Sequence, residues 1–178
     1  MKLFFMILFI STFCFAQTQK APKAVEFVDA KKFSGLWYEI ARTYNSFEKD
    51  CVAASVEYIL EEKSEFEVTN RCFHTTMEGE LIKYEGSAQS SNNKDINNIN
   101  TINITYFWIF TKEYSIIYID KNYSTAIMAD KDMQNVWIMN RKPFLEKEKL
   151  QNAVSFLDKY MDISKLIYTP QDSQGRYK

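Results

Sequence analysis

Apolar and polar residues alternate along most of the chain, which is the pattern of β-strands that bury one face. The segments that show it predict eight strands, at residues 33–44, 52–60, 66–73, 80–89, 104–110, 114–120, 124–130 and 136–141. The connections are short, so each strand should pair with its successor in an up-and-down barrel. An open sandwich is the alternative, but it would need more turn residues than four Gly and three Pro.

The hydrophobic period becomes helical after the eighth predicted strand. The apolar positions that recur at helical spacing are Leu150, Val154, Leu157 and Met161. They predict a helix over about 145–161, and residues 163–168 could add a short strand. The predicted fold class is therefore all-β: an eight-stranded antiparallel up-and-down barrel over about 33–141, with one C-terminal α-helix packed on its outside.

One internal stretch lacks any period. Residues Ser90–Asn103 are rich in Asn and Ser, a composition typical of loops. We predict a long mobile loop that runs into the fifth strand.

The first residues predict a signal peptide over 1–16. Lys2 supplies a positive start, an apolar segment follows, and Cys14-Phe15-Ala16 forms a small-x-small cleavage site. Cleavage would leave one domain, residues 17–178, that is exported to the periplasm, the outer membrane or the medium. The alternatives are a retained N-terminal anchor and lipidation of Cys14, although Phe13 stands where a lipidation site needs a small residue.

Composition excludes several function classes. The formal net charge is −1 and no basic run of five residues occurs, so nucleic acid is not an expected partner. With one His and three Cys, the chain has too few ligands for a four-ligand zinc site, and it lacks a Gly-rich phosphate loop. We predict no metal and no cofactor, with a haem held by His74 alone as a remote alternative. The 14 Phe and 11 Tyr suit a β-rich fold or a lined pocket.

Two cysteines remain after the predicted cleavage, Cys51 and Cys72. They would lie near the open end of the hairpin formed by segments 52–60 and 66–73. Export exposes thiols to oxidant, so we predict a Cys51–Cys72 disulfide, with two free buried thiols as the alternative.

The stretch Phe33-Ser-Gly-Leu-Trp-Tyr-Glu-Ile-Ala-Arg42 resembles the first signature of the lipocalins. The resemblance is to the branch of bacterial outer-membrane lipocalins and apolipoprotein D, where it reads Gly-x-Trp-Tyr-Glu-Ile-Ala-Arg. The second signature matches Asp120 and Tyr123, with Ile119 in place of the common Thr. The third matches Arg141, just past the eighth predicted strand. Within the likeness, residues 90–101 look like an insertion.

The resemblance implies that Gly35, Trp37 and Arg141 close one end of the barrel, with the Arg lying across the Trp ring in a cation–π contact. These residues are predicted to be structural rather than ligand-binding. Alternation along the first strand places two sets of side chains on opposite faces: Trp37, Glu39, Ala41 and Thr43 on one, and Tyr38, Ile40 and Arg42 on the other.

The resemblance also sets the inward phase for some of the other strands. On that phase the predicted ligand-binding residues are Ala54, Val56, Tyr58, Phe66, Val68, Asn70, Ile104, Tyr106, Tyr114, Ile116, Tyr118, Met128, Trp137 and Met139. Small side chains at Ala54 and Ala88 would leave room, while aromatic and Met side chains would give apolar walls. A core filled by its own side chains is the alternative.

The function that the resemblance implies is the binding of a fatty acid, lysophospholipid or similar apolar ligand for lipid transport or storage in the cell envelope under stress. Peripheral contact with a membrane would fit that role. The chain would not be an enzyme, because no acid–base pair stands at a set spacing. The alternatives are a lipocalin-fold enzyme that uses Cys72 or His74 on an apolar substrate, and an interaction module with a filled barrel.

Overall fold

The computed structural model describes residues 21–61, 65–92, 95 and 97–175. The predicted signal peptide and Cys14 lie outside them. The strands are β1 (Gly35–Arg42), β2 (Cys51–Leu60), β3 (Glu65–His74), β4 (Leu81–Ser90), β5 (Thr101–Tyr106), β6 (Phe110–Ile119), β7 (Thr125–Ala129), β8 (Val136–Asn140) and β9 (Ile167–Tyr168). The helices are α1 (Ala30–Phe33), α2 (Lys147–Leu157) and the 3₁₀ turn η2 (Ile163–Lys165).

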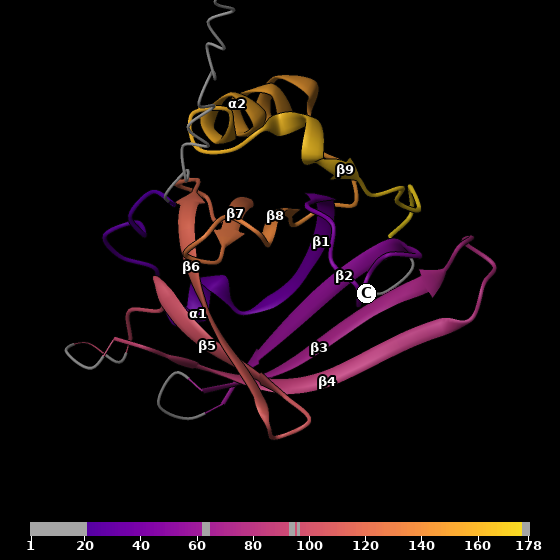
Figure 1. Cartoon of the computed structure of the whole chain (residues 1–178). Coiled ribbons are helices and arrows are strands. Elements are labelled where there is room, and N and C mark those ends of the chain that lie inside the picture. The colour runs from indigo at the N-terminus through magenta and orange to yellow at the C-terminus, as the bar shows by residue number, and fades with distance from the viewer. Residues whose placement is uncertain (1–20, 62–64, 93–94, 96, 176–178) are drawn as a thin grey trace, which may run out of the picture.

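The sheet closes on itself as an antiparallel barrel (Figure 1). Each strand from β2 to β8 pairs with its successor, and β1 pairs with both β2 and β8. Opposite Gly35 lies Tyr58, and opposite Tyr38 lies Asn140. This double pairing of β1 confirms the predicted barrel and excludes the open sandwich. The extra strand β9 pairs with the other end of β1.

Several predicted strand boundaries are wrong. The fifth strand was expected over 104–110, but β5 ends at Tyr106 and β6 begins at Phe110. The turn between them is itself apolar, so the hydrophobic pattern does not reveal it. In the predicted strand 163–168, Asp162 caps a 3₁₀ turn by accepting a hydrogen bond from the Ser164 amide. Only the last two residues pair with β1.

The predicted mobile loop over 90–103 is also wrong for its second half. Asn98 and Ile99 are buried. The Asn98 side chain accepts from the Val28 amide at 3.0 Å and donates to the Glu26 carbonyl at 3.0 Å. Asparagine amides can bond backbone in place of a strand partner, so an Asn-rich segment is tied here to the N-terminal segment.

Helix α2 lies across the outside of the barrel over β7 and β8 (Figure 1). The side chains buried under it belong to one cluster: Ile40, Ala41, Ile117, Ile127, Ala129, Met133, Val136, Ile138, Ala153, Leu157, Met161 and Leu166. The predicted external helix is therefore confirmed. The apolar outer face of these strands explains why β7 is buried along its whole length.

Irregularities in β1 and β6 reverse the predicted face of three residues. In β1 the register shifts between Glu39 and Ala41, so Ala41 packs outside with Ile40 while Arg42 turns toward Glu39. In β6 it shifts between Ile116 and Tyr118. The predicted inward orientation of Tyr118 is wrong: its ring lies 5.9 Å from that of Phe156 on α2. An extra residue on one strand breaks simple alternation.

Arg141 closes one end of the barrel against Trp37. The guanidinium lies 3.8 Å from the centre of the Trp37 ring, and the indole N–H donates to the Phe33 carbonyl at 2.8 Å. Arg141 donates to backbone carbonyls at the end of α1, in β1 and before β7, those of Lys32, Phe33, Ser34, Leu36 and Tyr123. The carbonyls at the end of a helix lack partners of their own, and the Arg141 guanidinium and the Trp37 indole supply donors here.

Two further features fit this end to Arg141. Burial lowers the pKa of Arg141 to about 10, which still leaves it charged at neutral pH. Gly35 has a φ of +97°, and a Cβ there would lie 3.4 Å from the guanidinium. A side chain at this position would therefore be strained and would crowd Arg141.

Candidate ligand-binding cavity

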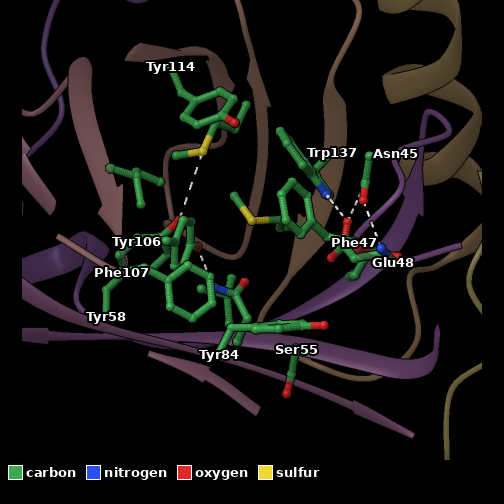
Figure 2. Close-up of a pocket in the computed structure, with 16 residues that line it drawn as sticks. Asn45, Phe47, Glu48, Ser55, Tyr58, Tyr84, Tyr106, Phe107, Tyr114 and Trp137 are labelled. Atoms are coloured by element: carbon green, nitrogen blue, oxygen red, sulfur yellow. Dashed lines mark hydrogen bonds between the residues drawn. The ribbon is translucent and has the colours of Figure 1, made fainter. Parts of the chain in front are cut away.

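A cavity of about 130 Å³ lies inside the open half of the barrel (Figure 2). Its walls come from the strands and from two connections at the open end, β1–β2 and β5–β6. The lining residues are Glu39, Asn45, Phe47, Glu48, Ser55, Val56, Tyr58, Asn70, Tyr84, Ile104, Tyr106, Phe107, Tyr114, Met128, Trp137 and Met139.

Most of the predicted inward side chains line this cavity. They are Val56, Tyr58, Asn70, Ile104, Tyr106, Tyr114, Met128, Trp137 and Met139. Three others, Phe66, Val68 and Ile116, lie in the same buried core but do not line the cavity. Ala54 packs against the two cysteines instead. With Tyr118 outside the barrel, these five residues do not contribute to the cavity wall, contrary to expectation.

The remaining lining residues were not predicted as a site. Glu39 lies on the same phase as Trp37, and Tyr84 pairs with Asn70, so alternation could have found both. Asn45, Phe47, Glu48 and Phe107 lie in connections, where alternation says nothing about direction. The closure of the cavity by these connections is a property of the fold that no strand pattern contains.

Three aromatic rings, which we call the mouth rings, stand edge to face at the open end: Phe47, Tyr84 and Phe107. The centroids of Phe47 and Tyr84 are 6.5 Å apart at 78°, and those of Tyr84 and Phe107 are 6.4 Å apart at 84°. Such T-shaped contacts are favourable for aromatic pairs. Phe47 and Phe107 remain 68% and 53% exposed, so the rings form a partial cover rather than a packed lid.

Three tyrosine hydroxyls of the wall, those of Tyr58, Tyr106 and Tyr114, are neutral at physiological pH. Burial raises the pKa of Tyr58 and of Tyr106, and it raises the pKa of Tyr114 to about 12. Tyr106 accepts a hydrogen bond from the Asn70 amide. The Tyr58 hydroxyl lies 3.9 Å from the Met128 sulfur. These groups can hydrogen-bond a ligand without carrying charge.

A buried charged cluster forms one side of the cavity. Arg42 Nη1 lies 3.3 Å from Glu39 Oε1, and Arg42 Nε lies 3.8 Å from Glu48 Oε2. The Trp137 indole donates to the same Glu48 oxygen at 3.1 Å, and Asn45 donates to it as well. The cluster therefore holds two carboxyl groups and one guanidinium.

The surroundings of Glu39 shift its pKa. Burial, followed by the nearby Glu48 carboxylate, raises the pKa of Glu39 well above its usual range. Arg42 and a hydrogen bond from Thr169 oppose the rise. Glu39 therefore retains its proton to a higher pH than an exposed glutamate.

The predicted disulfide is confirmed, since Cys51 and Cys72 are bonded to each other. The bridge leaves Cys72 without a thiol for nucleophilic chemistry. His74 lies outside the cavity wall, with Thr75 Oγ1 3.1 Å from its Nδ1 and Asp50 3.9 Å from its Nε2. Within the described ranges, no group of three or more His, Cys, Asp or Glu residues could hold a metal ion.

Comparison with known proteins identifies the fold family. The model of the lipocalin-like domain matches residues 28–171. The chain belongs to the lipocalin family. Among similar proteins, the outer membrane lipoprotein Blc of Citrobacter freundii is 28% identical over 84% of this chain and 85% of its own. Apolipoprotein D of Bos taurus is 30% identical over 84% of this chain and 80% of its own.

A solved lipocalin-like structure agrees with the architecture. Insecticyanin from the tobacco hornworm Manduca sexta superposes with a TM-score of 0.70 at 20% identity, covering 87% of each chain. In the present chain, the residues of the second signature organise the turn before β7. Asp120 accepts a hydrogen bond from the Ser124 amide at 2.6 Å, and the Tyr123 hydroxyl accepts one from the Asp29 amide at 2.9 Å. The turn thereby ties the N-terminal segment to the closed end.

Proposed function

We propose that this lipocalin is exported and binds a single-chain lipid, such as a fatty acid or a lysophospholipid, in its barrel without catalysis. The observation that carries the proposal is the cavity itself, which has aromatic, aliphatic and Met walls inside a barrel closed at one end. Transfer of each CH₂ group from water contributes about 0.8 kcal/mol. An acyl chain can therefore bind through burial alone.

The size of the cavity limits how the ligand enters. An engineered cavity of about 150 Å³ holds a benzene molecule, so about 130 Å³ receives only part of a long acyl chain. Further methylene groups need the exposed mouth rings Phe47 and Phe107 to move aside. Their partial exposure supports such a movement, because few contacts would be lost.

A blocking variant tests the proposal. Protein purified without detergent should release lipid on extraction, detected by mass spectrometry. Ile104→Trp adds bulk to the cavity wall and should abolish the lipid signal. Ile59→Trp adds the same bulk on a strand position that is 42% exposed and should retain it. Equal lipid in the two variants, or none in the unmodified protein, would contradict the proposal.

The enzymatic alternative has a separate test. The proposal of binding without catalysis is supported by the bridged Cys72 and by the position of His74 outside the cavity. We expect His74→Ala to leave unchanged any slow hydrolysis of an apolar ester by the protein. A loss of hydrolysis in that variant would favour the enzyme.

Contact with a membrane surface is a second part of the proposal. Four apolar residues at the β5–β6 tip are exposed: Phe107 at 53%, Trp108 at 97%, Ile109 at 74% and Phe110 at 64%. Phe107 and Trp108 also have positive φ angles of 52° and 59°, which aromatic residues seldom adopt. Trp is enriched at membrane interfaces. We propose that this tip inserts into a lipid surface beside the cavity mouth.

Vesicle flotation tests the contact. The protein should float with phosphatidylcholine vesicles, and Ile109→Asp should weaken that binding at least about tenfold. Phe144→Asp places the same charge on an exposed ring at 59%, outside the tip, and should not. Equal flotation of the two variants would remove the tip from the proposal.

Among the described residues, no helix has the length and apolar character needed to cross a bilayer.

A further inference from the structure

The ionisable side chains that line the cavity include acidic groups but no basic ones. Apart from tyrosines, the titratable residues that line it are Glu39 and Glu48, and no lysine or arginine lines it. A fatty acid carboxylate would therefore meet carboxyl groups and no facing cation. Unpaired like charges are costly where water is partly excluded.

The nearby cation does not correct this imbalance. Arg42 is 2% exposed and is absent from the cavity wall. It donates to Glu39, to Thr169 at 3.4 Å and to the Glu48 carbonyl. Its Nη atoms donate to protein groups and its Nε lies 3.8 Å from Glu48 Oε2, but the side chain does not line the cavity, so the cluster presents carboxyl oxygens there.

Glu48 is the carboxylate that a ligand can reach. Its side chain is 19% exposed, compared with 6% for Glu39. The Trp137 and Asn45 hydrogen bonds are both made to Oε2. They hold the carboxylate at the cavity wall beside Phe47, as Figure 2 shows.

The mouth rings add a second feature that favours a cation. The rings of Phe47 and Phe107 each lie nearly perpendicular to the ring of Tyr84. All three line the same open end of the cavity as Glu48. A cation over an aromatic face is attracted by the electron density of the ring, and clusters of such rings recognise quaternary ammonium groups. Rings and carboxylate together form a site for a compact organic cation.

We propose that the mouth of the cavity binds the cationic head, a protonated amine or a quaternary ammonium, of an amphiphile whose apolar tail enters the barrel. This inference rests on the proposed binding of a single-chain lipid and narrows its chemistry. It favours ligands that carry an amine in the head group and disfavours free fatty acids. Glu48 supplies the charge, and the mouth rings supply the cation–π faces.

Four amphiphiles of equal tail length test the head group: dodecyltrimethylammonium, dodecylamine, dodecanol and dodecanoate. Each is titrated by calorimetry below the concentration at which it forms micelles or separates from water. We expect both cations to bind at least about tenfold more tightly than dodecanoate. The affinity of dodecanol should lie between that of the cations and that of dodecanoate. Glu48→Gln keeps the shape of the side chain and should reduce the preference to within about twofold. Glu113→Gln removes an exposed carboxylate on β6 and should leave the preference intact.

A second variant isolates the rings. Phe47→Leu changes an exposed loop residue, so folding should be unaffected, and it should weaken dodecyltrimethylammonium binding several-fold more than dodecanol binding. Equal affinities for all four probes, or tightest binding of dodecanoate, would overturn the head-group inference while leaving apolar binding in place. Failure of dodecanol and all the other probes to bind would instead overturn the proposed lipid-binding function.

Discussion

Each end of the barrel holds an arginine, partly buried at the closed end and buried at the open end, and the two meet different acceptors. At the closed end, Arg141 lies on the Trp37 ring and donates to five backbone carbonyls. At the open end, Arg42 faces two carboxyl groups, those of Glu39 and Glu48. Neutral acceptors surround the first guanidinium, and ionisable acceptors surround the second.

This difference separates stability from binding. At the closed end, the donors of Arg141 are directed to backbone carbonyls of the protein rather than to the cavity. The open end retains carboxyl oxygens and exposed rings that face the cavity. Changes at the closed end should therefore alter the free energy of unfolding without altering ligand preference. At the open end, changes to Glu48 or to the mouth rings should alter ligand preference instead.

The largest effect is expected at the closed end. Trp37→Ala should lower the free energy of unfolding by about 3–5 kcal/mol, since it removes a large, fully buried side chain. Arg141→Ala should also lower it, because Trp37 loses its cation–π contact and five backbone carbonyls lose a donor. Urea denaturation measures both, and Trp108→Ala, at a 97% exposed position, is the control that should change little. Retained stability together with lost binding in either closed-end variant would reverse the comparison.

The disulfide is the next largest effect, and it lies at the open end. The Cys51–Cys72 bridge closes a loop with a sequence separation of 21, for which the chain-entropy model gives about 3 kcal/mol. Replacing both cysteines by alanine should lower the free energy of unfolding by this amount. The preference among ligands should survive in protein that remains folded, because neither cysteine lines the cavity. A variant as stable as the parent would show that the bridge is dispensable.

The sequence predicts the closed end better than the open end. Gly35, Trp37 and Arg141 belong to signatures whose spacing is fixed by their mutual contacts, so the resemblance could locate them. Regular strands in the middle of the barrel were also found by alternation. Alternation fails where an extra residue enters a strand, and Ala41 and Tyr118 therefore fall on the outer face.

The open end escaped prediction for a different reason. Phe47, Glu48 and Phe107 lie in connections, whose path depends on the strands they join. Arg42 faces Glu39 only because β1 is irregular between Glu39 and Ala41. The charged cluster thus depends on long-range geometry, and the hydrophobic pattern carries no information about it.

The open end should also make stability depend on pH. A single titrating group such as Glu39 changes the free energy of unfolding by at most about 1.4 kcal/mol per pH unit. The pKa of Glu39 is raised in the folded protein above about 4.5, so the folded state holds this proton more tightly than the unfolded chain. Its contribution is fully present below that value and declines as pH rises toward the folded pKa. Glu39→Gln should therefore gain stability relative to the parent protein as pH rises.

The test is urea denaturation at several values between about pH 5 and pH 8. The groups that face Glu39 are Arg42, Glu48 and Thr169, and all are kept in the variant. Glu113→Gln, at an exposed position, should give a curve parallel to that of the parent protein. Parallel curves for Glu39→Gln as well would mean that Glu39 ionises normally in the barrel.

The smallest expected effects are changes in tryptophan fluorescence, which show how deep the ligand tail reaches into the barrel. The three tryptophans report on different places: Trp37 at the closed end, Trp137 on the cavity wall and Trp108 on the exposed tip. Ligand should quench Trp137, so Trp137→Phe should remove most of the fluorescence response while the fold is kept. Affinity should rise about fourfold for each added CH₂ and then level off, because about 130 Å³ is soon filled. An affinity that does not rise with chain length before it levels off, or a response from Trp37 instead, would place the ligand elsewhere. A response confined to Trp137 would instead mean that the tail ends above the Trp37–Arg141 contact.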